Sequence, residues 1–127
     1  MISLPHPVRV FLHTPATDLR KGFDALCGLV STAFGQDPTS GHLFLFVNRR
    51  RDRIKILYWD RDGLAIWYKR LESGSFQIPS APRDAVSIEM TPTQLSLILS
   101  AIDLRSARQR KRYQRPPPAA ENRPFPS

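Results

Sequence analysis

Residues 46–76 combine cationic side chains with aromatic rings that carry a polar edge. Guanidinium and ammonium groups can neutralise phosphates, and flat rings can stack on bases or fill a protein core. The turn signal Asp62-Gly63 lies in the same stretch, so one twisted hairpin could present both kinds of side chain. This chemistry makes a nucleic acid the first partner to consider. The rings with a polar edge are Tyr58, Trp59, Trp67 and Tyr68.

Four arginines occupy the five positions from 49 to 53, where the pattern predicts a hairpin turn. A charge cluster at a turn is usually solvated surface, but this density exceeds what solubility requires. We therefore expect phosphate contacts, which position a protein on DNA without reading its sequence. For Arg70, a local surface ion pair with Glu72 is an equally simple explanation. The hairpin cations predicted to contact DNA are Arg49, Arg50, Arg51, Arg53, Lys55, Lys69 and Arg70.

Trp59 is the preferred candidate for stacking on a base, because it shares a predicted strand face with Arg53 and Lys55. The alternative is that the hairpin aromatics are core or cross-strand packing residues, which stabilise hairpins without any ligand. The sequence leaves this choice open, since it does not say which strand face is exposed.

A metal-dependent nuclease is a further alternative, because two-metal phosphoryl transfer needs converging carboxylates, and the candidates are Asp52, Asp60, Asp62 and Glu72. Asp60 and Asp62 are explained more simply as hairpin-turn residues, and Glu72 lies far along the returning strand. The histidines are scattered, and a single cysteine, Cys27, cannot build a thiolate site. We therefore predict a protein that is not an enzyme, with no catalytic residue, metal site or cofactor.

The positive charge is concentrated near the C-terminus. The chain has a formal net charge of +8; residues 105–127 hold seven Lys or Arg and one acid, and residues 1–104 hold twelve and ten. Basic tails bind nucleic acid with little specificity, and they also bind acidic protein surfaces. The prolines 116–118 predict that the end of this tail is disordered. Its predicted DNA contacts are Arg108, Arg110, Lys111 and Arg112.

No apolar run reaches the ~18 residues of a membrane span. The N-terminus lacks the apolar core of a signal peptide, and the single cysteine fits a reducing compartment. We expect a cytoplasmic protein, associated with the nucleoid if it is bound to DNA, with no membrane or small-molecule partner.

Hydrophobic patterning predicts five strands and two helices. The first helix, residues 19–34, would be capped by Asp18 and ended by Gly35. The second would begin after Thr91, with Gln94 closing a capping box, and its apolar stripe would reach Ile102. Gly63 is expected to supply a positive φ at the hairpin turn. The predicted strands are residues 8–12, 43–47, 53–59, 64–70 and 86–90.

These elements predict an α+β fold in residues 1–104: a small antiparallel sheet of hairpin-connected strands with both helices on one face. One amphipathic helix would follow the first strand, and the other would be C-terminal. Residues 105–127 would form a basic, Pro-rich tail outside this single domain.

Several motifs recur in order, with fitting gaps, over most of residues 8–104. They are residues 18–26 (DLRKGFDAL), 38–41 (PTSG), 44–46 (FLF), 48–53 (NRRRDR), 55–60 (KILYWD), 62–63 (DG), 67–72 (WYKRLE), Gly74, Phe76, Pro79 and residues 95–103. In these motifs the chain resembles the small accessory proteins of the insertion-sequence-66 transposon family. These are commonly called TnpB and are distinct from the RNA-guided nuclease of that name. Leu19 departs from the pattern, where the family more often has Met.

The resemblance implies a role in DNA transposition beside a separate, larger transposase, and it implies no established catalytic residues. The main hypothesis is a non-enzymatic accessory factor that binds DNA, either transposon ends or non-specific duplex, through the basic hairpin and tail. The alternative is a protein–protein adaptor that docks the transposase without binding DNA. The metal-dependent nuclease ranks third.

Overall fold

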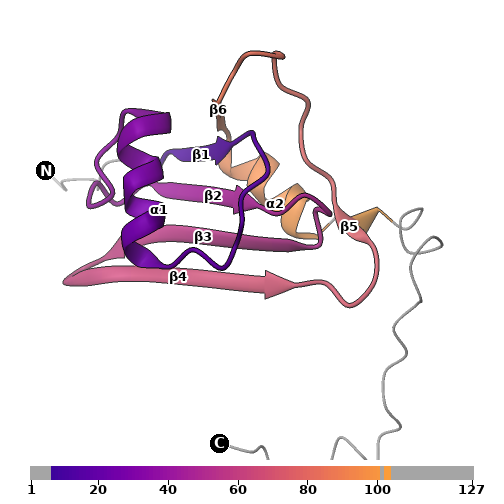
Figure 1. The fold of residues 1–127 in the computed structure, drawn as a ribbon, viewed down its shortest axis with the longest axis horizontal. Coiled ribbons are helices and arrows are strands. Elements are labelled where there is room, and N and C mark those ends of the chain that lie inside the picture. Colours follow the sequence, from indigo (N-terminus) through magenta and orange to yellow (C-terminus); the bar gives the residue numbers. More distant parts are fainter. Residues whose placement is uncertain (1–6, 101, 104–127) are drawn as a thin grey trace, which may run out of the picture.

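The computed structural model describes residues 7–100 and 102–103 of the 127-residue chain. A five-stranded sheet forms the centre of the molecule, with strand order β4-β3-β2-β1-β6 (Figure 1). The predicted β2 is confirmed with its expected bounds, and the other strands shift by one or two residues. The strands are β1 Val10–His13, β2 Leu43–Val47, β3 Arg53–Asp60, β4 Gly63–Arg70 and β6 Ser87–Met90.

The sheet is mostly antiparallel, and the α+β class is confirmed, but one pair of strands is parallel. β1 pairs with β2 in parallel, whereas β2–β3, β3–β4 and β1–β6 are antiparallel. The long connection from β1 to β2 contains the helix α1 (Phe23–Leu29), which is the crossover that parallel strands require. A hairpin-only sheet was therefore an incorrect expectation at this position.

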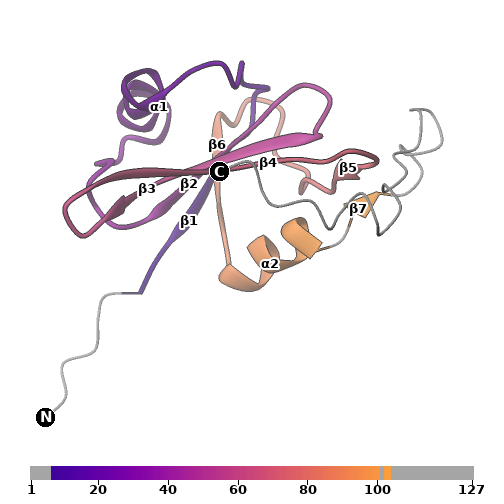
Figure 2. The same cartoon turned by 90° about the horizontal axis from the view of Figure 1, so that it is seen from below.

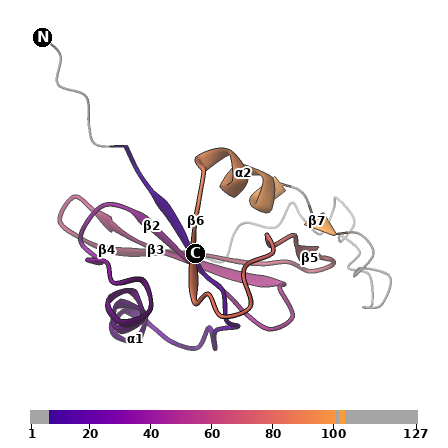
Figure 3. The same ribbon diagram turned by 90° about the horizontal axis from the view of Figure 1, so that it is seen from above.

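The two helices cover opposite faces of the sheet, so the prediction that both lie on one face is wrong. α1 lies on one side and α2 (Pro92–Ser100) on the other (Figures 2 and 3). The physical reason lies in β2, where four of the five residues, Phe44–Val47, are buried. Phe44 and Phe46 pack against Leu26 and Val30 on the α1 side, while Leu45 and Val47 belong to the cluster of Ile98 on the α2 side.

The segment before α1 differs from the predicted capped helix. α1 begins at Phe23 with Gly22 as N-cap, and no side chain caps it. The Asp18 carboxylate instead accepts a hydrogen bond from the Arg20 amide at 3.0 Å. It also forms an ion pair with the Arg20 guanidinium at 2.7 Å. The helix continues as a π-helical turn, Val30–Phe34, and ends as predicted at Gly35, whose φ is 61°.

The capping box of α2 is confirmed in both directions. The Gln94 amide donates to Thr91 Oγ1 at 3.1 Å, and the Thr91 amide donates to Gln94 Oε1 at 2.8 Å. The helix stops at Ser100, before the predicted end of its apolar stripe. Ile102 instead lies in a short strand, β7 (Ile102–Asp103), which pairs with β5 (Ser75–Phe76).

The β3–β4 turn places its positive φ at a different residue from the predicted one. Arg61 has φ 58°, whereas Gly63 lies in β4 and pairs with Asp60.

The described residues contain no helix long and apolar enough to cross a membrane. The predicted tail, residues 105–127, lies outside the described residues, with its contacts Arg108, Arg110, Lys111 and Arg112.

His13 makes stability depend on pH in a defined direction. Its ring lies 5.9 Å from that of Phe34 and 5.8 Å from that of Phe46, and burial lowers the pKa of the imidazole. Below about pH 6.5 the unfolded chain takes up a proton that the folded chain resists, so acidification removes stability. We expect His13→Phe to reduce the fall in the urea midpoint between pH 7 and pH 5. An equal fall in both proteins would contradict this assignment.

Candidate nucleic-acid interface

The arginine cluster forms a tight turn between β2 and β3, and we call residues 48–53 the arginine turn. The Asn48 amide donates to the Arg53 carbonyl at 3.2 Å, and the Arg51 amide donates to the Asn48 carbonyl at 3.0 Å. Arg51 has φ 59°, a left-handed conformation that an arginine adopts only where its surroundings impose it. The turn predicted from the sequence is thus present, and its backbone conformation is specific.

The Asn48 side chain fixes the shape of this turn. Its Oδ1 accepts hydrogen bonds from the amides of Asp52 at 3.1 Å and Arg53 at 3.0 Å. Its Nδ2 donates to Asp52 Oδ1 at 2.7 Å. Asp52 is only 8% exposed, so this carboxylate faces the turn and not the solvent. Among the acids considered for a nuclease, Asp52 therefore has a structural explanation.

Three neighbouring segments hold the arginine turn from outside. The Thr17 amide donates to Val47 at 2.8 Å, at the entry to the turn. The amides of Leu71 and Phe76 each donate at 2.7 Å, to the carbonyls of Asp52 and Arg51 respectively. Because its backbone is bonded on several sides, the turn presents its arginines from a fixed base.

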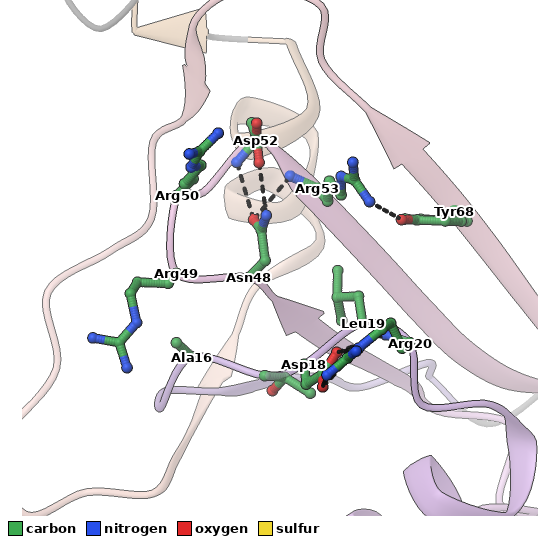
Figure 4. Close-up of a pocket in the computed structure, with 11 residues that line it drawn as sticks. Ala16, Asp18, Leu19, Arg20, Asn48, Arg49, Arg50, Asp52, Arg53 and Tyr68 are labelled. Atoms are coloured by element: carbon green, nitrogen blue, oxygen red, sulfur yellow. Dashed lines mark hydrogen bonds and ion pairs between the residues drawn. The ribbon is translucent and has the colours of Figure 1, made fainter.

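A pocket of about 660 Å³ lies beside the arginine turn (Figure 4). Its walls come from the turn, from the segment before α1 and from β4. Arg49, Arg50 and Arg53 are all exposed there, and the Arg49 guanidinium extends away from the turn. The lining residues are Ala16, Thr17, Asp18, Leu19, Arg20, Asn48, Arg49, Arg50, Asp52, Arg53 and Tyr68.

Asp18, the more exposed of the two acids that line this pocket, forms an ion pair with the neighbouring Arg20. The Arg20 guanidinium hydrogen bonds to Asp18 and holds the pKa of that carboxyl well below its usual range. Asp18 therefore stays ionised and paired at any pH near neutrality. The remaining arginines of the pocket leave it with an excess of positive charge.

The two strands of the β3–β4 hairpin place like charges directly opposite each other. Arg53 pairs in register with Arg70, an arrangement that normally destabilises a sheet. Each guanidinium turns to a different partner: Arg70 donates to Glu72 Oε1 at 2.9 Å, and Arg53 Nη1 lies 3.4 Å from the Tyr68 hydroxyl. The local Arg70–Glu72 pair considered from the sequence is thus present.

Lys55 links the hairpin to the segment before α1. Its ammonium donates to the Lys21 carbonyl at 2.9 Å and lies 4.9 Å from the centroid of the Tyr68 ring. Lys55 is half-buried, unlike the arginines of the turn. Its contacts make it part of the framework that supports the pocket.

The structure separates the other predicted contact residues from this pocket. Arg51 lines a different pocket with Thr14 and residues 78–83. Lys69 pairs with Ile54, whose side chain is in the α2-side core, so Lys69 points to the opposite face of the sheet. Trp59 is about 20 Å along β3 from Arg53, and its indole donates to the Arg61 carbonyl at 3.1 Å.

Sequence reasoning did not select Asn48 or Tyr68 as site residues. Asn48 immediately precedes the arginines, and Asn at the first position of a turn is a recognised signal for side-chain bonding to the backbone. Tyr68 was grouped with the other hairpin aromatics. Its cross-strand partner is Lys55, and this pairing places its ring on the Arg53 side of the sheet.

Within the part of the chain that the structure describes, no group of three or more His, Cys, Asp or Glu could hold a metal ion. Asp60 and Asp62 lie at the β3–β4 turn, at the opposite end of β3 from Asp52. Glu72 lies near the Asp52 end, where it pairs with Arg70, so the four carboxylates considered from the sequence do not converge on one site.

The fold and the pocket define a small α+β protein with an arginine-rich turn at one end of the sheet. A family model described as IS66 Orf2 like protein matches residues 8–109, and the chain belongs to this family. The family links the protein to transposition in an accessory role, and its members are generally not catalytic. The expectation drawn from the sequence motifs is confirmed at this level.

Two relatives from Sinorhizobium fredii (strain NBRC 101917 / NGR234) are similar over most of the chain. Uncharacterized protein y4jC is 35% identical over 103 residues, which cover 81% of this chain and 86% of the relative. Uncharacterized protein y4hO is 38% identical over 105 residues, which cover 83% and 90%. No solved structure matches the chain.

Proposed function

We propose that this protein is a non-enzymatic accessory factor for transposition that binds duplex DNA through the arginine turn, assisted by the basic tail. One observation carries the proposal: three exposed arginines, Arg49, Arg50 and Arg53, extend from a turn whose backbone is fixed by Asn48. Such a group suits the phosphates of a duplex, because guanidinium groups bind phosphate oxygens in a fork geometry.

The pattern of ion pairs supports a polyanionic partner. Between described residues, the ion pairs are Arg9–Glu89, Arg20–Asp18 and Arg70–Glu72. None of them includes an arginine of the turn. The turn holds four arginines and one carboxylate, that of Asp52, so phosphate groups would offset its excess positive charge.

The proposed contacts position the protein on DNA and do not read bases. The turn supplies cations and amides, whereas direct readout needs an element inserted into a groove with side chains against base edges. Selectivity for transposon ends, if present, would then come from DNA shape or from the transposase.

The test is a fluorescence-anisotropy titration with transposon-end and scrambled duplexes at several salt concentrations. We expect a variant carrying Arg49→Gln, Arg50→Gln and Arg53→Gln to lower the salt slope by about 3, because each phosphate contact contributes about 0.9. The matched control carries Arg61→Gln, Lys69→Gln and Arg83→Gln. It loses the same charge from exposed positions outside the pocket.

The control separates a defined contact surface from general attraction. A control slope close to that of the wild type would support the arginine turn as the contact site. Equal losses in both variants would mean that only net charge matters, and the proposed surface would be wrong.

Absence of duplex binding at low salt would favour the adaptor alternative, in which the protein docks the transposase. One feature suits that alternative: a shallow apolar pocket of about 340 Å³ beside α2, lined by Ile78, Pro79, Leu97 and Ile98 among others. Leu97 is 57% exposed there and contributes apolar surface to this pocket.

A further inference from the structure

We propose that the pocket beside the arginine turn binds an unpaired nucleotide of DNA, with Tyr68 as the stacking surface for its base. The inference rests on the proposed function and deepens it, because it assigns a ligand to the pocket in addition to the duplex phosphates. It also replaces Trp59, the residue favoured by the sequence, with a residue that lies beside the arginines.

The size and shape of the pocket favour a single nucleotide over a duplex. Its volume of about 660 Å³ lies within the range of sites that hold small molecules. A stacked duplex is too wide to enter a cavity of this size and would contact only the rim. One nucleotide turned out of the stack, or carried on a single-stranded end, could enter.

Tyr68 is held in a position that suits stacking. The residue is 46% exposed and lies on β4, which is the edge strand of the sheet among the described residues. Lys55 lies over the ring at 4.9 Å, and the hydroxyl is 3.4 Å from Arg53 Nη1. These two contacts fix the ring while leaving nearly half of the residue open to a base.

The neighbouring groups supply the second half of a nucleotide site. Arg53 adjoins the ring, so a phosphate attached to a stacked base would meet its guanidinium, while Arg49 and Arg50 line the same pocket farther from Tyr68 (Figure 4). Cations beside an aromatic surface are the usual means of binding single-stranded DNA, and they tolerate any base because every base has a flat face. We therefore expect little dependence on the identity of the unpaired base.

The experiment compares a blunt duplex with the same duplex carrying a three-nucleotide single-stranded overhang. We expect the full-length protein to bind the overhang duplex about tenfold more tightly, a typical gain for one stacked base. Tyr68→Leu should bring the ratio of the two affinities close to one, whereas Tyr68→Phe should preserve it. The matched control is Trp67→Leu, which removes the adjacent exposed aromatic from the opposite sheet face.

A second readout places the base on the ring. With 2-aminopurine in the overhang, binding of the wild-type protein should change the fluorescence of this base, whereas binding of the Tyr68→Leu variant should not. Urea midpoints of the variants check that they fold. Duplex binding without any gain from the overhang, or a gain that Tyr68→Leu retains, would overturn the pocket assignment alone. If the wild-type protein bound neither the blunt nor the overhang duplex, the DNA-binding function itself would be overturned.

Discussion

Neutralising the basic tail should weaken duplex binding more than any single substitution in the described domain. A full-length variant with Arg108→Gln, Arg110→Gln, Lys111→Gln and Arg112→Gln is expected to lower the salt slope by about 4. Removal of residues 105–127 should lower it by about 6, because this segment holds seven Lys or Arg and one acid. Anisotropy titrations over a range of salt concentrations measure both slopes.

The tail should contribute affinity and little selectivity. A dense run of cations neutralises phosphates wherever they lie, so the ratio of affinities for transposon-end and scrambled duplexes should stay unchanged in both tail variants. A chain ending at Leu104 that binds DNA as tightly as the full chain, with the same salt slope, would disprove this role. The arginine-turn variant then serves as the positive control for a lowered slope.

Local patterns were sufficient to predict the elements with simple physical causes. The run LFLFV at residues 43–47 predicted a buried strand, and β2 is buried on both faces. The Thr91–Gln94 capping box predicted the start of α2, because both of its hydrogen bonds form within four residues. Gly35 ends the first helical segment for a similarly local reason, a left-handed φ that glycine adopts without strain.

The arrangement of the site depended on contacts that no local pattern contains. Alternation placed Lys55 and Trp59 on one face of β3, which is consistent with the register. It could not show that the two residues have different neighbours. Lys55 lies beside Tyr68, whereas the indole of Trp59 is hydrogen bonded at the β3–β4 turn. The position of Lys69 likewise follows from pairing with Ile54, a contact between strands.

The start of the first helix shows the same limit. Asp18 has the residue type of an N-cap, but its carboxylate is occupied by Arg20 two residues later. An Asx-type turn and a helix cap compete for the same oxygen atoms, and the turn prevails here. The consequence is functional, since residues 16–20 stay irregular and form one wall of the pocket.

Asn48→Ala should lower the free energy of unfolding by about 2 kcal/mol, because it removes three hydrogen bonds at a turn that backs onto a buried carboxylate. Asp52, at 8% exposed, would lose the Nδ2 donor that now faces it. Urea denaturation measures the change. The control is Asp37→Ala, which removes the bonds from Asp37 to the amide and hydroxyl of Thr39 in an exposed turn and should have a smaller effect.

The same variant tests whether the arginine turn acts through its shape or only through its charge. Asn48→Ala keeps every cation, so a purely electrostatic surface would retain its affinity for duplex DNA under conditions where the variant is folded. A surface that depends on fixed guanidinium positions would lose affinity, because ordering the loop on binding costs conformational entropy. We expect the second result, a several-fold loss with a nearly unchanged salt slope, and Asp37→Ala should bind like the wild type. Unchanged affinity in Asn48→Ala would show that the turn contributes charge alone.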